Sequence, residues 1–208
     1  MSRTLLLGVL LALMLPFAGE GRAALLASRA RKPAQSSSEI AAAEAYSRRL
    51  DQYKKRNPGR ARFLADVSNY QANEQASWRV FKNRRQLERA DAYTTAAVWT
   101  RPTGEIVVAD LFLTSPSGDW ATYATYYFRD DGRLAKSRSE LRTFMGDLVV
   151  IRERLYDTGG RLLRETARYL DLKTRRPKRV RAGDFMDVPA PNYAKTSELP
   201  FYRLLKKQ

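Results

Sequence analysis

The chain has 208 residues, with 38 basic and 22 acidic side chains, a formal net charge of +16, and neither cysteine nor histidine. The missing residue types exclude disulfides, Ser-His-Asp and Cys-His catalysis, and ordinary zinc, copper and haem sites. An enzyme of this composition would have to use carboxylates, Lys, Arg, Tyr or Ser, so the sequence favours a non-enzymatic protein and predicts no cofactor.

Residues 1–23 have the organisation of a secretory signal peptide. A basic start is followed by an eleven-residue apolar stretch from Leu5 to Leu15, and Gly21 and Ala23 fit the −3 and −1 positions of a cleavage site. Eleven apolar residues are too few to span a membrane, which needs about 20. We therefore expect an exported chain, periplasmic or extracellular, with no transmembrane segment in its mature part.

Positive charge is concentrated at both ends of this predicted mature chain. Residues 24–62 contain ten basic and three acidic side chains, residues 173–208 contain the same numbers, and residues 63–172 contain sixteen and fifteen. We expect a flexible basic segment over 24–35, a single α+β domain over 36–172 and a basic C-terminal tail over 173–208 that is extended or mobile.

An amphipathic helix is predicted from Glu39 to Arg56. Apolar residues recur there at helical spacing, at Ile40, Ala43, Tyr46, Leu50 and Tyr53. Ser36 with Glu39 resembles a capping box, and the Asn57-Pro58-Gly59 sequence would end the helix. Residues 60–92 fit the period of neither helix nor strand, so a second helix and an edge strand both remain open.

Five glycines spaced by fourteen residues divide the centre of the chain: Gly104, Gly118, Gly132, Gly146 and Gly160. Each lies in a turn-like setting, and glycine supplies the positive φ that hairpin turns need. The segments between them are rich in β-branched and aromatic residues, which is typical of strands. The predicted strands are Tyr93–Thr100, Glu105–Thr114, Trp120–Phe128, Arg133–Phe144, Leu148–Tyr156 and Leu162–Leu172.

The predicted fold is therefore α+β: an antiparallel β-meander of six or more strands, as a curved sheet or half-barrel, packed on the N-terminal amphipathic helix. If odd positions form the inner face, the even positions of the later strands are mostly cationic. That register puts Lys136, Arg154 and Arg164 in one cross-strand row, with Arg138 and Arg152 in the next. Such rows favour an anionic partner; the alternative is that long stems cover apolar sheet while the charges stay in water.

The same register places Glu153 and Glu165 opposite each other on the inner face, near Ser137 and Thr125. Two adjacent carboxylates can serve as an acid and a base, as in glycoside hydrolysis. Their direct opposition leaves no cleft between them, and pairing with arginine or exposure to water is the alternative.

Two turns resemble known sequences. The sequence YDTGGRL over 156–162 resembles the tyrosine-aspartate hairpin of YD-repeat proteins, and YFRDDGRL over 127–134 resembles a looser copy. The stretch from Tyr93 to Leu172 as a whole is similar to β-meanders of exported bacterial proteins of unknown function. No activity, ligand or site residue follows from either resemblance.

The densest positive charge is a nine-residue run in which six side chains are basic: Lys173, Arg175, Arg176, Lys178, Arg179 and Arg181. Such runs bind polyanions. In an exported protein, anionic lipid, lipopolysaccharide or a cell-wall polymer is a better candidate partner than nucleic acid. The alternative is a solvated basic tail without a partner.

The sequence thus predicts an exported binding or structural module that attaches to an anionic envelope component through its basic flanks. One alternative is a periplasmic carrier or chaperone that holds an apolar ligand between sheet and helix, in a pocket lined by Tyr123, Tyr127 and Ile151. The other is a carboxylate-dependent hydrolase of cell-wall glycan. The oligomeric state does not follow from the sequence.

Overall fold

The computed structural model describes residues 33–69, 74–181, 183–185 and 187–206. The predicted signal peptide lies outside these residues, as does most of the predicted flexible segment over 24–35. The last residues of that segment are helical, because helix α1 (Pro33–Arg56) begins six residues before Glu39. Ser36 therefore lies inside the helix and not at its N-cap. The predicted end at Arg56 is confirmed, and a 3-10 turn, η1 (Pro58–Arg60), follows.

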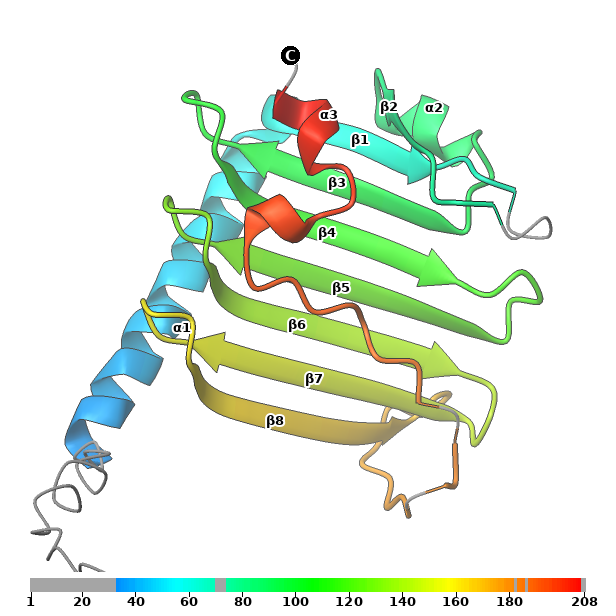
Figure 1. The fold of residues 1–208 in the computed structure, drawn as a ribbon. Coiled ribbons are helices and arrows are strands. Elements are labelled where there is room, and N and C mark those ends of the chain that lie inside the picture. The colour runs from blue at the N-terminus through cyan, green and yellow to red at the C-terminus, as the bar shows by residue number, and fades with distance from the viewer. Residues whose placement is uncertain (1–32, 70–73, 182, 186, 207–208) are drawn as a thin grey trace, which may run out of the picture. The chain divides into compact units, whose positions relative to one another are not determined.

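Eight strands form one antiparallel sheet, which confirms the predicted α+β meander (Figure 1). The six predicted strands correspond to β3 to β8, and residues 60–92 add two strands and a short helix, α2 (Arg84–Glu88). The strand order is β2-β1-β3-β4-β5-β6-β7-β8, so β2 and β8 are the edges and the sheet is not closed. The strands are β1 (Ala61–Asp66), β2 (Trp78–Phe81), β3 (Thr94–Thr100), β4 (Ile106–Thr114), β5 (Trp120–Phe128), β6 (Leu134–Thr143), β7 (Leu148–Tyr156) and β8 (Leu162–Asp171).

The regularly spaced glycines lie at the turns between consecutive strands from β3 to β8. All five have positive φ, between +75° and +91°. In the resulting antiparallel sheet, the turns at Gly104, Gly132 and Gly160 lie at one end of the strands, and those at Gly118 and Gly146 lie at the other.

The prediction that odd positions share one face is wrong. From β3 to β8, apart from the bulges beside three turns, paired residues are separated by an even number of residues, as for Thr114 and Ala121, so an even position pairs with an odd one. The parity of each face therefore alternates from strand to strand. One cross-strand row, for example, contains Val108, Tyr127, Lys136, Leu155 and Arg164.

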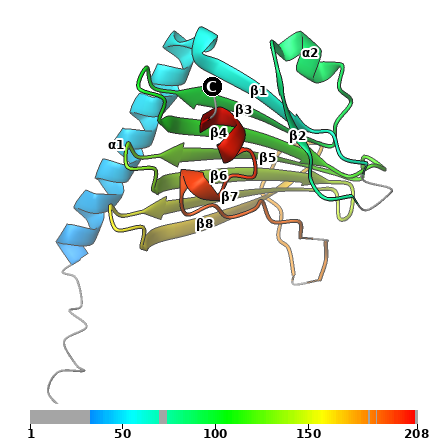
Figure 2. The same cartoon turned by 45° about the horizontal axis from the view of Figure 1, so that its top comes forward.

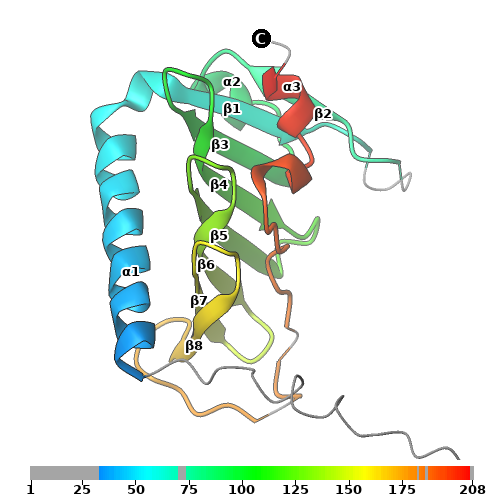
Figure 3. The same ribbon diagram turned by 60° about the vertical axis from the view of Figure 1, so that its left-hand side comes forward.

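Each face of the sheet is covered by a different part of the chain (Figure 3). Helix α1 packs on one face, which we call the α1 face, with Leu50 in a cluster with Trp99, Val108 and Tyr127. The opposite face, the C-terminal face, is covered by the chain after β8. Because both faces are buried, β4 has buried residues at consecutive positions and not in simple alternation.

The C-terminal segment includes the turn η3 (Thr196–Glu198) and the short helix α3 (Tyr202–Lys206). The sequence predicts an extended or mobile tail here; instead, the segment crosses the C-terminal face and completes its core. Leu199 and Phe201 are 3% and 0% exposed and pack in one cluster with Leu64 and Val98.

Candidate functional site

The cations predicted to form rows on one face lie on both faces of the sheet. Lys136, Arg138 and Arg164 are on the α1 face, whereas Arg152 and Arg154 are on the C-terminal face. The predicted rows of like charge therefore do not form.

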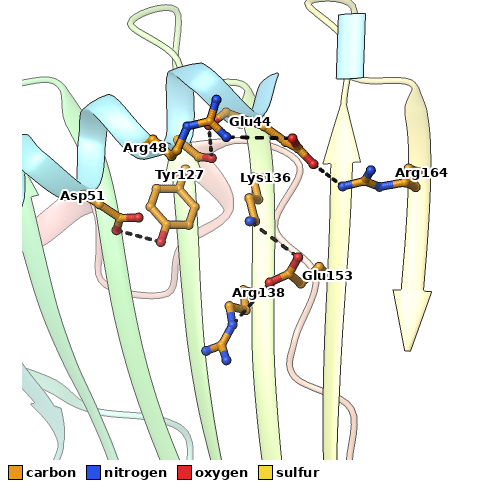
Figure 4. Close-up of polar contacts among 9 residues, drawn as sticks. Glu44, Arg48, Asp51, Tyr127, Lys136, Arg138, Glu153 and Arg164 are labelled. Carbon is orange, nitrogen blue, oxygen red and sulfur yellow. Dashed lines mark hydrogen bonds and ion pairs between the residues drawn. The ribbon is translucent and has the colours of Figure 1, made fainter. Parts of the chain in front are cut away.

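All five of these cations have carboxylate partners. On the α1 face, Lys136 and Arg138 lie 3.6 and 3.4 Å from the Glu153 carboxylate, and Arg164 donates to Glu44 on α1 (Figure 4). On the other face, Arg152 pairs with Asp187 at 2.7 Å and Arg154 pairs with Glu165 at 2.8 Å. Their charges are used within the fold, so they are poor candidates for binding an external anion.

The predicted carboxylate pair of Glu153 and Glu165 is also wrong. Glu153 is paired in register with Thr166, whereas Glu165 is paired with Arg154 on the opposite face. The alternation of parity separates the two carboxylates, and each contacts cations instead of its predicted partner.

Polar contacts fasten α1 to the sheet near the turns at Gly104 and Gly132. The Tyr127 hydroxyl donates to Asp51 at 2.8 Å, and burial, together with the nearby Asp51 charge, raises the pKa of Tyr127. Lys54 donates to Asp110 at 2.8 Å, and Asp110 also accepts from Thr125. These contacts join α1 to β4 and β5 on the α1 face.

Helix α1 covers only one end of its face, and a groove of about 500 Å³ lies beside α2 on the same face. Figure 2 shows α1 and α2 at opposite ends of the strands. The groove is hollow because small residues, such as Thr95 and Ala97, line it together with the larger Phe63, Phe112 and Tyr123. Of the residues predicted to line a carrier pocket, Tyr123 lines this groove, whereas Tyr127 and Ile151 do not.

A cluster of guanidinium groups adjoins the groove. Arg142 and Arg175 donate to the buried Glu140 carboxylate at 2.9 Å, and Arg138 lies 3.6 Å from it. Burial acts to raise the pKa of Glu140, but the hydrogen bonds from Arg175 and Arg142 outweigh burial and lower it. Arg142 also lies over the ring of Tyr123, 4.7 Å from the centroid.

Sequence reasoning did not identify this cluster as a site. The sequence did contain one indication of the cluster. Glu140 is the only acidic residue at an even position in β6 and β7, where the other charged residues at even positions are basic. No local sequence pattern indicates that Arg175 binds Glu140, because the two residues are 35 positions apart and a loop brings them together.

The run from Lys173 to Arg181, which we call the basic loop, follows β8 directly. Asp171 orders its start by accepting from the backbone and hydroxyl of Thr174, hydrogen bonds that lower the pKa of Asp171. Lys178 donates to the carbonyls of Gly146 and Asp147, at 2.7 and 3.3 Å.

Two of the six basic side chains in the loop form polar contacts with the rest of the described chain. Arg175 is bound to Glu140, and Lys178 to the carbonyls and, at 3.8 Å, to Asp171. The other four are exposed and form no ion pair with any residue that the structure describes: Lys173, Arg176, Arg179 and Arg181. These four side chains therefore form a cationic surface that no described carboxylate pairs with.

Within the described ranges, no group of three or more acidic side chains could hold a metal ion. None of the helices described there combines the length and hydropathy needed to cross a membrane. The chain matches no protein-family model, no curated protein and no solved structure. The interpretation of the basic loop and the groove therefore depends on their own geometry and chemistry.

Proposed function

We propose that this chain is an exported, non-enzymatic binding module that attaches to an anionic component of the cell envelope through the basic loop. The observation that carries the proposal is the contrast between two sets of cations. The five cations predicted to form rows on the sheet are paired with carboxylates, whereas Lys173, Arg176, Arg179 and Arg181 are exposed and form no ion pair with a described residue.

The fold holds the basic loop in place. Lys178 ties it to the β6–β7 turn, Leu172 donates its N–H to the Asp147 carbonyl at 2.9 Å, and Lys178 donates its own N–H to Tyr169. A loop fixed in this way loses less conformational entropy on binding than a free basic tail. The anchored loop therefore favours a docking surface over a solvated tail.

Replacing the four free cations by glutamine tests the proposal: K173Q, R176Q, R179Q and R181Q. At low salt, we expect the variant to bind phosphatidylglycerol vesicles and soluble polyphosphate about 1,000-fold more weakly, since each cation near an anionic surface contributes severalfold to affinity. Sedimentation with vesicles and a titration with polyphosphate measure the two affinities.

The matched control removes the same charge from exposed cations on and beside β1 and β2, at the opposite edge of the sheet from β8: R62Q, R79Q, K82Q and R89Q. It should keep most of the parent's affinity for both anions. Equal losses in the two variants would attribute binding to net charge alone and would contradict attachment through the basic loop.

A second candidate function is to hold a small amphiphile in the groove. The groove favours it because apolar lining from Phe112 and Tyr123 lies next to the Arg142 guanidinium, which suits an apolar body with an anionic end. Replacing Ala97 by phenylalanine would fill the groove. We expect the variant to bind a fluorescent long-chain fatty acid at least tenfold more weakly, with vesicle binding unchanged; equal fatty-acid binding would reject this function.

A further inference from the structure

Two large apolar residues, adjacent in the sequence, are exposed at the turn between β6 and β7. Phe144 and Met145 are 68% and 50% exposed. The turn is well defined, because the Asp147 N–H donates to the Phe144 carbonyl at 3.1 Å and the Phe144 N–H donates to Asp119. Turn residues are usually polar, so adjacent exposed Phe and Met side chains in an ordered turn indicate an interaction surface.

The basic loop lies against this turn. Lys178 binds the Gly146 carbonyl at 2.7 Å, and the Leu172 N–H binds the Asp147 carbonyl at 2.9 Å. The turn also contacts Asp184, whose carbonyl would lie 2.9 Å from a Cβ placed on Gly146. The exposed apolar pair and the free cations of the basic loop therefore lie at one end of the sheet.

We propose that this end is a membrane-docking tip, in which Phe144 and Met145 enter an anionic bilayer while the free cations of the basic loop bind lipid phosphates. This inference rests on the proposed function and names its partner as a bilayer of anionic phospholipid. The cations concerned are Lys173, Arg176, Arg179 and Arg181.

Exposed apolar side chains next to free cations favour a bilayer over a soluble polyanion as the partner. A dissolved polymer would occupy the cations but would leave Phe144 and Met145 in water. A bilayer presents phosphate and hydrocarbon in adjacent layers, which match neighbouring cationic and apolar side chains. Four carboxylates lie at this turn or beside the basic loop, Asp119, Asp147, Asp171 and Asp184, and the six basic side chains of the loop outnumber them.

The first test replaces both apolar side chains, as F144S/M145S. We expect about 30-fold weaker binding to phosphatidylglycerol vesicles, because two apolar side chains no longer leave water, and unchanged binding to polyphosphate. The control is L162S, which replaces an exposed apolar residue at the opposite end of the strands and should bind both anions as the parent does.

The second test measures directly whether the tip enters the bilayer. The chain has no cysteine, so M145C and L162C each accept a single polarity-sensitive fluorophore. On phosphatidylglycerol vesicles, the emission of the label at position 145 should shift to the blue, whereas the label at position 162 should not change.

The outcomes separate this inference from the proposed function. Vesicle binding by F144S/M145S equal to that of the parent, or no shift at position 145, would overturn the docking tip while leaving attachment through the basic loop intact. A parent that binds polyphosphate but not vesicles would overturn the tip in favour of a soluble polymer. A parent that binds neither would reject the proposed function as well.

Discussion

Replacing Phe201 by alanine is expected to lower the free energy of unfolding by about 4 kcal/mol. Its ring is 0% exposed and meets Trp78 edge-on, with the centroids 4.8 Å apart. Alanine would leave a cavity between the C-terminal segment and the sheet, in the cluster that contains Leu64 and Val98. Urea denaturation followed by circular dichroism measures the change.

Phe144 provides the control for this prediction, because it is the same residue type at 68% exposure. Replacing it by alanine should change the free energy of unfolding by no more than about 0.5 kcal/mol. A loss below about 1 kcal/mol for Phe201→Ala would show that the C-terminal segment is not part of the cooperative core.

Replacing Gly146 by alanine is expected to lower the free energy of unfolding by about 2–3 kcal/mol, for two reasons. Gly146 has φ +80°, which costs a residue with a Cβ about 1 kcal/mol. The new Cβ would also lie 2.9 Å from the Asp184 carbonyl oxygen, so backbone must move, and such overpacking costs about 1–3 kcal/mol.

Gly104 separates these two effects. It has a similar φ of +91°, but a Cβ placed there would meet nothing within 4 Å. Gly104→Ala should therefore show only the backbone strain, about 1 kcal/mol. Equal losses for the two variants in urea denaturation would mean that Asp184 does not pack against the β6–β7 turn.

The strands could be predicted because their signals are local. Gly118, Gly132, Gly146 and Gly160 mark the ends of segments with β composition, and β5 and β7 have the bounds that the sequence predicts. The two strands before Thr94 were left open because β1 and β2 are short, and the WRVF of β2 is followed after two residues by the short helix α2.

The side-chain directions could not be predicted, because they depend on the length of each connection. One residue more or less in a hairpin moves every following side chain to the other face. The six strands were therefore located correctly, while Lys136 and Arg154 were assigned to one face although they lie on opposite faces.

The C-terminal segment and the site show a second limit of local patterns. Leu199 and Phe201 have no strand or long helix around them, so only the fold shows that they are buried. Charge density located the basic loop, but which of its cations are free depends on Glu140 and Gly146, both distant in sequence. The exposure of Phe144 and Met145 could have been predicted, since these two large apolar residues lie in the turn sequence TFMGD.

The central claim is that free cations on the basic loop bind an anionic surface. The most direct test is the affinity of the parent for phosphatidylglycerol vesicles across a salt series, since screening shortens from about 10 Å at 0.1 M to about 3 Å at 1 M salt. We predict a steep loss of affinity with salt for the parent and a much shallower loss for the variant without Lys173, Arg176, Arg179 and Arg181. Equal affinity of the parent at all salt concentrations would contradict the claim.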